Sequence, residues 1–170
     1  MLIKQTTWLT PPPATVVPQA GNYRILPETQ IRRIAVTSKS DVEDELAQAR
    51  MGWTEYQSTR ERDAVYQYLT AVFEVVGLWK KQRRAKASSL QALAATKHPG
   101  AIRIQEPFAI VIFCTSDPRT VDARTRNKWA RALQFAERFK PVAQGLAQFI
   151  KSRGGINACA DDWYRKDQKS

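Results

Sequence analysis

Three arginines recur at seven-residue intervals in the stretch 121–140: Arg124, Arg131 and Arg138. In a helix this spacing places them along one edge, about 10.5 Å apart. Guanidinium groups pair with phosphate oxygens in a forked geometry and release condensed counterions, so this edge can contact successive phosphates of a nucleic acid. We call these three residues the arginine ridge. Arg126 and Lys128 add charge near the start of the same helix.

The apolar neighbours of the arginine ridge support a second interpretation. The adjoining arc of this helix is expected to face the core, and it carries Val121, Trp129, Ala132, Leu133, Ala136 and Phe139. Arginines at such a boundary can lay their stems on apolar surface and keep their charged heads in water. Phosphate contact and this purely structural role both remain open.

The densest charge in the chain is a run of five cations in seven positions, which we call the basic run: Lys80, Lys81, Arg83, Arg84 and Lys86. Like charges this close repel one another, and binding to a polyanion would relieve that cost. A solvated surface is the alternative, and in a eukaryotic chain the run can also be read as a nuclear address. The charge is uneven along the chain, because residues 77–100 hold six basic residues and no acidic one, whereas residues 41–76 hold eight acidic against three basic.

Signatures of catalysis and metal binding are poor. The single histidine, His98, lies where a helix is expected to stop, and Cys114 and Cys159 look like small buried hydrophobes without a partner at metal-binding spacing. No glycine-rich phosphate loop or nucleophile elbow occurs. The acids of residues 41–45 fit a helix start without a cation. We therefore predict a non-catalytic protein with no cofactor and no metal.

Two further features have a structural and a functional interpretation. Gly154-Gly155 between two short helices invites comparison with a helix-turn-helix, but Lys151 and Asp161 stand where a small and an apolar residue are usual, so a plain helical hairpin is preferred. The tryptophans at 53, 79 and 129 continue apolar helical stripes and read as core rather than as platforms for bases. Trp8 lies beside a proline triplet and can dock on another subunit.

Helical periodicity and capping residues predict most of the elements. The strongest stripe is Val65, Leu69, Val72, Val76 and Trp79. Pro141 and the Gly154-Gly155 pair are expected to end two of the later helices. The helices are expected over about 41–56, 59–86, 89–97, 121–140, 142–153 and 157–166.

The apolar run Phe108–Cys114, rich in β-branched residues, predicts a buried strand over about 101–115. Short strands are also possible at Leu2–Trp8 and Ile31–Thr37. Residues 1–38 hold five prolines and are expected to form an extended N-terminal arm. The expected fold is thus mainly α with a small β component: a single helical domain over 39–170 with one short sheet, preceded by the arm.

Length and composition fit this expectation and favour a polyanionic partner. The chain has 170 residues and a net charge of +11, and 43% of its residues are hydrophobic. No apolar run approaches the roughly 20 residues of a spanning helix, and the start lacks the pattern of a signal peptide, so a cytoplasmic protein without a membrane partner is expected. We predict nucleic-acid binding, DNA rather than RNA, through Lys80, Lys81, Arg83, Arg84, Arg124, Arg126, Lys128, Arg131 and Arg138. The alternative is an assembly factor that docks on a second copy or another protein through the N-terminal arm.

Overall fold

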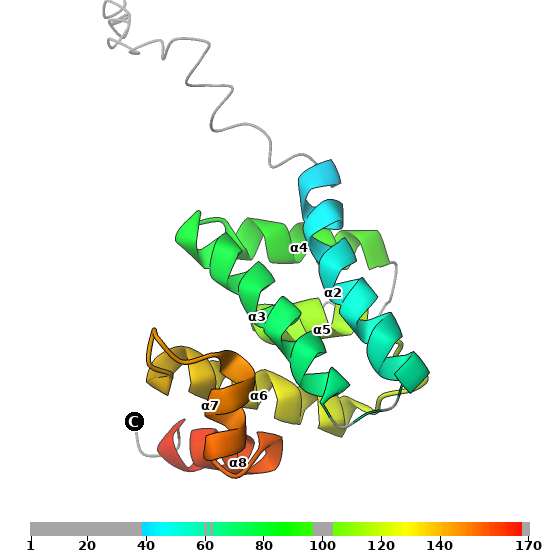
Figure 1. The fold of residues 1–170 in the computed structure, drawn as a ribbon. Helices are drawn as coiled ribbons and strands as arrows, with labels where there is room; N and C mark the ends of the chain where they lie inside the picture. Colours follow the sequence, from blue (N-terminus) through cyan, green and yellow to red (C-terminus); the bar gives the residue numbers. More distant parts are fainter. Residues whose placement is uncertain (1–38, 60, 62, 97–103, 168–170) are drawn as a thin grey trace, which may run out of the picture. The chain divides into compact units, whose positions relative to one another are not determined.

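A computed structural model describes residues 39–59, 61, 63–96 and 104–167, all of which belong to the compact unit Val36–Ser170. These residues form seven helices and no strand (Figure 1). The helices are α2 (Lys39–Thr59), α3 (Ala64–Lys81), α4 (Ala85–Thr96), α5 (Pro107–Thr115), α6 (Ala123–Phe139), α7 (Leu146–Ser152) and α8 (Ile156–Asp167). No described helix is both long and apolar enough to cross a bilayer. The predictions for the N-terminal arm, its two short strands, Trp8 and His98 lie outside the described residues.

The core forms around α5, which packs against α2, α3, α4 and α6. Figure 1 shows α2 and α3 crossing over α5, with α6, α7 and α8 grouped together in the lower part of the view. None of the nine residues of α5 is exposed. The predicted stripe of α3 faces this core, since Leu69, Val72, Val76 and Trp79 are fully buried.

The prediction of a strand over 101–115, and with it the small sheet, is wrong for the described residues. Residues 107–115 are helical because Glu106 caps the helix, accepting a hydrogen bond from the Ala109 N–H at 2.7 Å, and Pro107 occupies its first turn. A continuous apolar run does not by itself separate a buried strand from a buried helix. Here the run is apolar on every side because other helices cover every side.

The helix predicted over 59–86 covers only Ala64–Lys81, because the helix breaks within the basic run. The chain leaves α3 at Gln82, Arg83 adopts a left-handed conformation with φ of 57°, and α4 begins at Ala85 instead of the predicted position 89. No apolar face continues through this run, so burial does not reward a straight helix there. Arg84 instead turns back to form an ion pair with Glu45 on α2.

Among the last three helices, α8 packs along α6. The helix expected over 142–153 is shorter at its start, because residues 141–144 form a turn in which the Gln144 N–H donates to the Pro141 carbonyl at 3.1 Å. Gly154 and Gly155 end α7 with φ of +91° and +95°, a conformation that favours glycine. The chain then reverses into α8.

A buried hydrogen bond joins α3 to α5, and its removal can test the packing of these two helices. The hydroxyls of Tyr68 and Thr115 lie 2.8 Å apart, and Thr115 also donates to the Val111 carbonyl at 2.7 Å. Burial raises the pKa of Tyr68 above its ordinary value, so its hydroxyl stays protonated at neutral pH.

We expect Thr115→Val to lower the free energy of unfolding by about 2 kcal/mol and Tyr68→Phe by about 1 kcal/mol. The first variant costs more because it leaves the buried Tyr68 hydroxyl with only the longer bond to the Ile112 carbonyl, at 3.5 Å. Urea denaturation followed by circular dichroism measures both. Thr70→Val is the control, since the Thr70 hydroxyl bonds only within its own helix. Equal values for Thr115→Val and Thr70→Val would contradict the packing of α5 as a helix on α3.

Candidate nucleic-acid interface

The first turn of α6 is fixed by its N-cap, Asp122. One carboxylate oxygen of Asp122 accepts a hydrogen bond from the Thr125 N–H at 2.7 Å, and the other lies 3.0 Å from the Thr125 hydroxyl. These bonds to Thr125 hold the pKa of Asp122 below its ordinary value. The cap therefore stabilises the first turn of α6, on which Arg124 lies.

The three residues of the arginine ridge lie on one exposed side of α6. Arg124, Arg131 and Arg138 are all exposed, and a seven-residue interval rotates a side chain by only about 20° around a straight helix. The opposite side carries the core residues Trp129 and Leu133. No ion pair joins a ridge arginine to an acid among the described residues.

Aromatic rings of α6 and α8 lie beside the ridge. The Arg131 guanidinium lies 5.5 Å from the centre of the Tyr164 ring, and Arg138 lies 5.6 Å from that of Phe139. From α8, the Lys166 ammonium lies 3.9 Å from the centre of the Phe139 ring. The contact of Phe139 with Lys166 is therefore further towards the C-terminus than that of Arg131 with Tyr164, on both helices. The two helices thus run in the same direction. We call the surface formed by Arg124, Arg131, Arg138, Tyr164 and Lys166 the α6–α8 seam.

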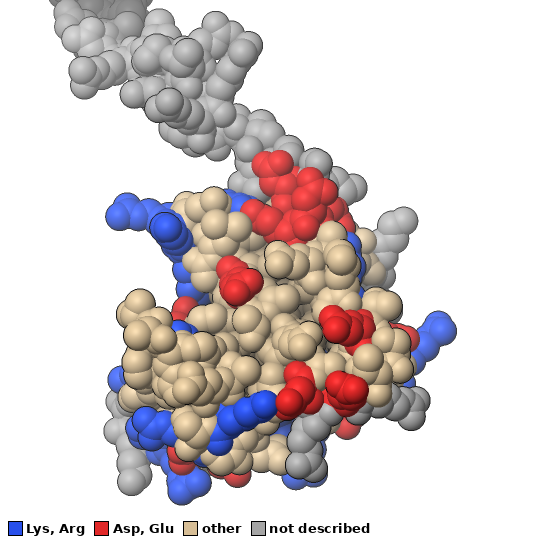
Figure 2. Space-filling model, in the orientation of Figure 1, with Lys and Arg blue, Asp and Glu red and all other residues tan. Residues whose placement is uncertain are grey.

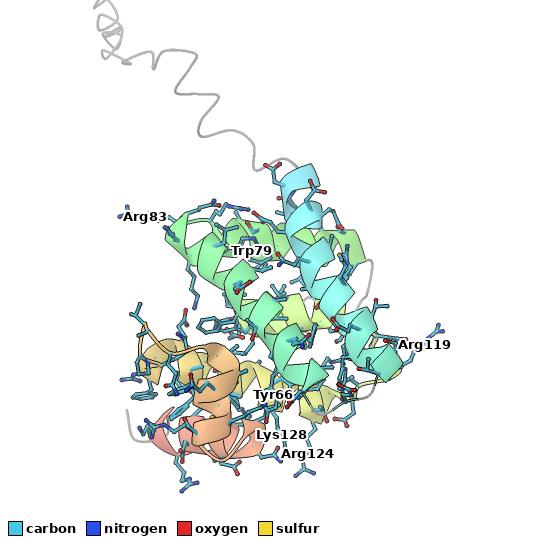
Figure 3. All side chains as sticks on the ribbon, viewed as in Figure 1. Tyr66, Trp79, Arg83, Arg119, Arg124 and Lys128 are labelled. Atoms are coloured by element: carbon cyan, nitrogen blue, oxygen red, sulfur yellow. The ribbon has the colours of Figure 1, made fainter. Side chains whose placement is uncertain are left out.

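The other two predicted cations of α6, Lys128 and Arg126, differ in their position relative to the ridge. Lys128 is partly buried, and Figure 3 places it close to Arg124 in projection. Arg126 lies over the Phe113 ring of α5 at 5.2 Å, and its Nη1 is buried without a hydrogen-bond partner among the described residues. Its guanidinium therefore serves packing between α5 and α6 more than contact with a ligand.

Two members of the basic run are bound within the fold. The Lys80 ammonium donates to both carboxylate oxygens of Glu137 on α6, at 2.6 and 2.7 Å, and lies over the Phe108 ring. Arg84 donates to Glu45, Gln82 and Ser88.

Glu45 also accepts the indole N–H of Trp79 at 2.6 Å, so Arg84 and Glu45 tie α2 to both α3 and α4. No pattern in the sequence marks this pair, because its members are 39 positions apart. The remaining predicted members, Lys81 and Arg83, are exposed, as is Lys86.

The basic run and the arginine ridge lie on different sides of α6. Lys80 reaches α6 at Glu137, and consecutive positions such as Glu137 and Arg138 point about 100° apart around a helix. Figure 3 places Arg83 at one edge of the unit and Arg124 with Lys128 at another. Figure 2 shows Lys and Arg in separate groups on that face, with the acids of α2 gathered near its start. The structure therefore offers two basic surfaces, of which only the ridge is continuous along one helix.

The geometry of α7 and α8 does not support the comparison with a helix-turn-helix. Lys151 on α7 pairs with Asp63 at 2.7 Å and lies over the Tyr66 ring. On α8, Asp161 is exposed and Asp162 lies 3.4 Å from Arg165, so the outward side of this helix carries both signs of charge. Such a surface does not resemble a helix built to enter a DNA groove, whose phosphates favour positive charge.

The cysteines and the described tryptophans are buried or partly buried. Cys114 and Cys159 are free, and burial raises the pKa of each thiol to about 11. The described residues contain no group of three His, Cys, Asp or Glu side chains that could hold a metal ion. Trp53, Trp79 and Trp129 are buried in the core, and Trp163 is partly buried against it.

The cap of α6 gives a pH-dependent prediction. Because the folded-state pKa of Asp122 lies below its unfolded value, its contribution to stability is present above the unfolded pKa and is lost as pH falls through the folded pKa. We expect Asp122→Ala to be less stable than the wild type at neutral pH, with the difference shrinking on acidification below the ordinary range of an aspartate. Urea denaturation at several pH values measures this difference, with Asp161→Ala as the control; a difference that does not change with pH would contradict the cap.

The role of Arg84 can be separated from binding. We expect Arg84→Ala to lower the free energy of unfolding by about 2 kcal/mol, between the values for an exposed and a fully buried ion pair, because it leaves the Glu45 carboxylate without its cation. Lys81→Ala, at an exposed position, should change it by less than about 0.5 kcal/mol. Thermal and urea denaturation give both values. Arg84→Ala with wild-type stability but weakened binding to nucleic acid would show a binding role instead.

Comparisons with known proteins add no further identification: no protein-family model, no curated protein and no solved structure matches this chain. The geometry of its own residues must carry the functional interpretation.

Proposed function

We propose that the protein binds nucleic acid through the phosphate backbone, with the arginine ridge as the principal contact surface. The observation that carries the proposal is the exposure of Arg124, Arg131 and Arg138 on one side of α6 without acidic partners among the described residues. Guanidinium groups about 10.5 Å apart along a rigid helix can each take a phosphate oxygen. Lys128 supplies a further cation beside Arg124, whereas Arg126, Lys80 and Arg84 serve the fold.

The charge of the chain supports the same proposal. A net charge of +11 raises the local concentration of a polyanion and favours association with DNA, which we take as the partner in preference to RNA. No base-reading element is proposed, because contacts to phosphates position a protein without reading sequence. We place this activity in the cytoplasm, where the free thiols of Cys114 and Cys159 would remain reduced.

The salt dependence of binding tests the proposal. The triple variant Arg124→Gln, Arg131→Gln, Arg138→Gln should bind more weakly, and its slope of log affinity against log salt should be smaller by about 3, because each phosphate contact releases close to one counterion. Fluorescence anisotropy of a labelled DNA duplex in a salt titration measures both quantities.

A matched control loses the same charge at scattered exposed positions: Lys86→Gln, Arg119→Gln, Arg153→Gln. Figure 3 shows Arg119 well separated from Arg124. The control should keep most of the wild-type slope. An equal fall for both triples would mean that net charge, not the ridge, governs binding. Absence of wild-type binding to both duplex and single-stranded DNA at low salt would overturn the proposal.

A further inference from the structure

Tyr164 stands apart from the other aromatic residues of the described chain. It is the only one among them with an exposed side chain, at 51%, whereas Trp53, Trp79 and Phe149 are buried and Tyr66 is partly buried. Its neighbours Cys159 and Ala160 anchor α8 in the core. The Tyr164 side chain therefore keeps about half of its surface open to solvent.

The position of this ring relates it to the arginine ridge. Arg131, the middle residue of the ridge, lies over the Tyr164 ring at 5.5 Å, and Arg124 and Arg138 follow two helical turns to either side along α6. An exposed ring beside a row of cations combines the two elements with which proteins hold unpaired nucleotides: a stacking platform for bases and a basic track for the backbone.

We propose that the α6–α8 seam binds single-stranded nucleic acid, with an unpaired base stacked on Tyr164 while Arg131 and its ridge neighbours contact the flanking phosphates. This inference rests on the proposed function and narrows its substrate class. A duplex keeps the faces of its bases inside the stack, so a ring beside the backbone gains little from it. A single strand exposes those faces, and stacking on tyrosine tolerates any base sequence.

The test compares Tyr164→Leu and Tyr164→Phe with the wild type, using a mixed-sequence single-stranded DNA oligonucleotide and the duplex of the same sequence in fluorescence anisotropy. Tyr164→Leu should weaken binding to the single strand about tenfold, within the range expected for one base stacked on an aromatic ring. It should weaken duplex binding much less, because there it only frees the Arg131 side chain from the ring. Tyr164→Phe keeps the ring and should retain single-strand affinity. Circular dichroism verifies that each variant is folded.

The matched control is Tyr66→Leu, since Tyr66 is a partly buried tyrosine of α3 that also lies beneath a cation, here Lys151. It should leave both affinities unchanged. If Tyr164→Leu weakens both probes equally, or neither, while the ridge variants still weaken binding, the stacking inference is overturned and the proposed function stands. If the wild type binds neither probe at low salt, both are overturned.

Discussion

Burial of α5 is the constraint on which the rest of the structure depends. Its sequence, PFAIVIFCT, has no polar side of its own, so a helix made from it is stable only if other helices cover it all round. Four helices do so, namely α2, α3, α4 and α6. The position of α6 follows from this requirement, because its apolar arc must close the core over α5. Part of its remaining arc packs against α8, and the arginine ridge lies on the part that faces solvent.

The same constraint explains what the sequence could and could not predict. Amphipathic helices can be predicted from the sequence because only one side carries apolar residues, as at Val72 and Val76 in α3 or Trp129 and Leu133 in α6. Residues 107–115 lack that contrast, and their β-branched content favoured the wrong element; the useful signal was the local pair Glu106-Pro107. The break at Arg83 and the ion pair of Arg84 with Glu45 depend on contacts between distant parts of the chain. Periodicity carries no information about such contacts.

Charge density along the sequence does not show which charges are paired within the fold. The basic run contains the densest cluster, yet Lys80 and Arg84 neutralise Glu137 and Glu45 and hold helices together. The arginine ridge is sparser, but its seven-residue spacing keeps every member on one exposed side of a single helix. A local excess of lysine and arginine can therefore be used in part by the fold itself, although Lys81, Arg83 and Lys86 remain exposed. The candidate residues Arg126 and Arg131 illustrate the difference, since they lie on the same helix but face different neighbours.

The stacking of arginine on aromatic rings has a thermodynamic consequence for the ridge. A long cationic side chain loses rotamer entropy when it is fixed on a ligand, and that loss weakens binding. Arg131 over Tyr164 and Arg138 over Phe139 have already lost part of this freedom in the unbound protein. The structural role considered for these arginines, with stems on apolar surface and heads in water, is thus compatible with phosphate contact: it would reduce the entropic cost of fixing Arg131 and Arg138 on a phosphate.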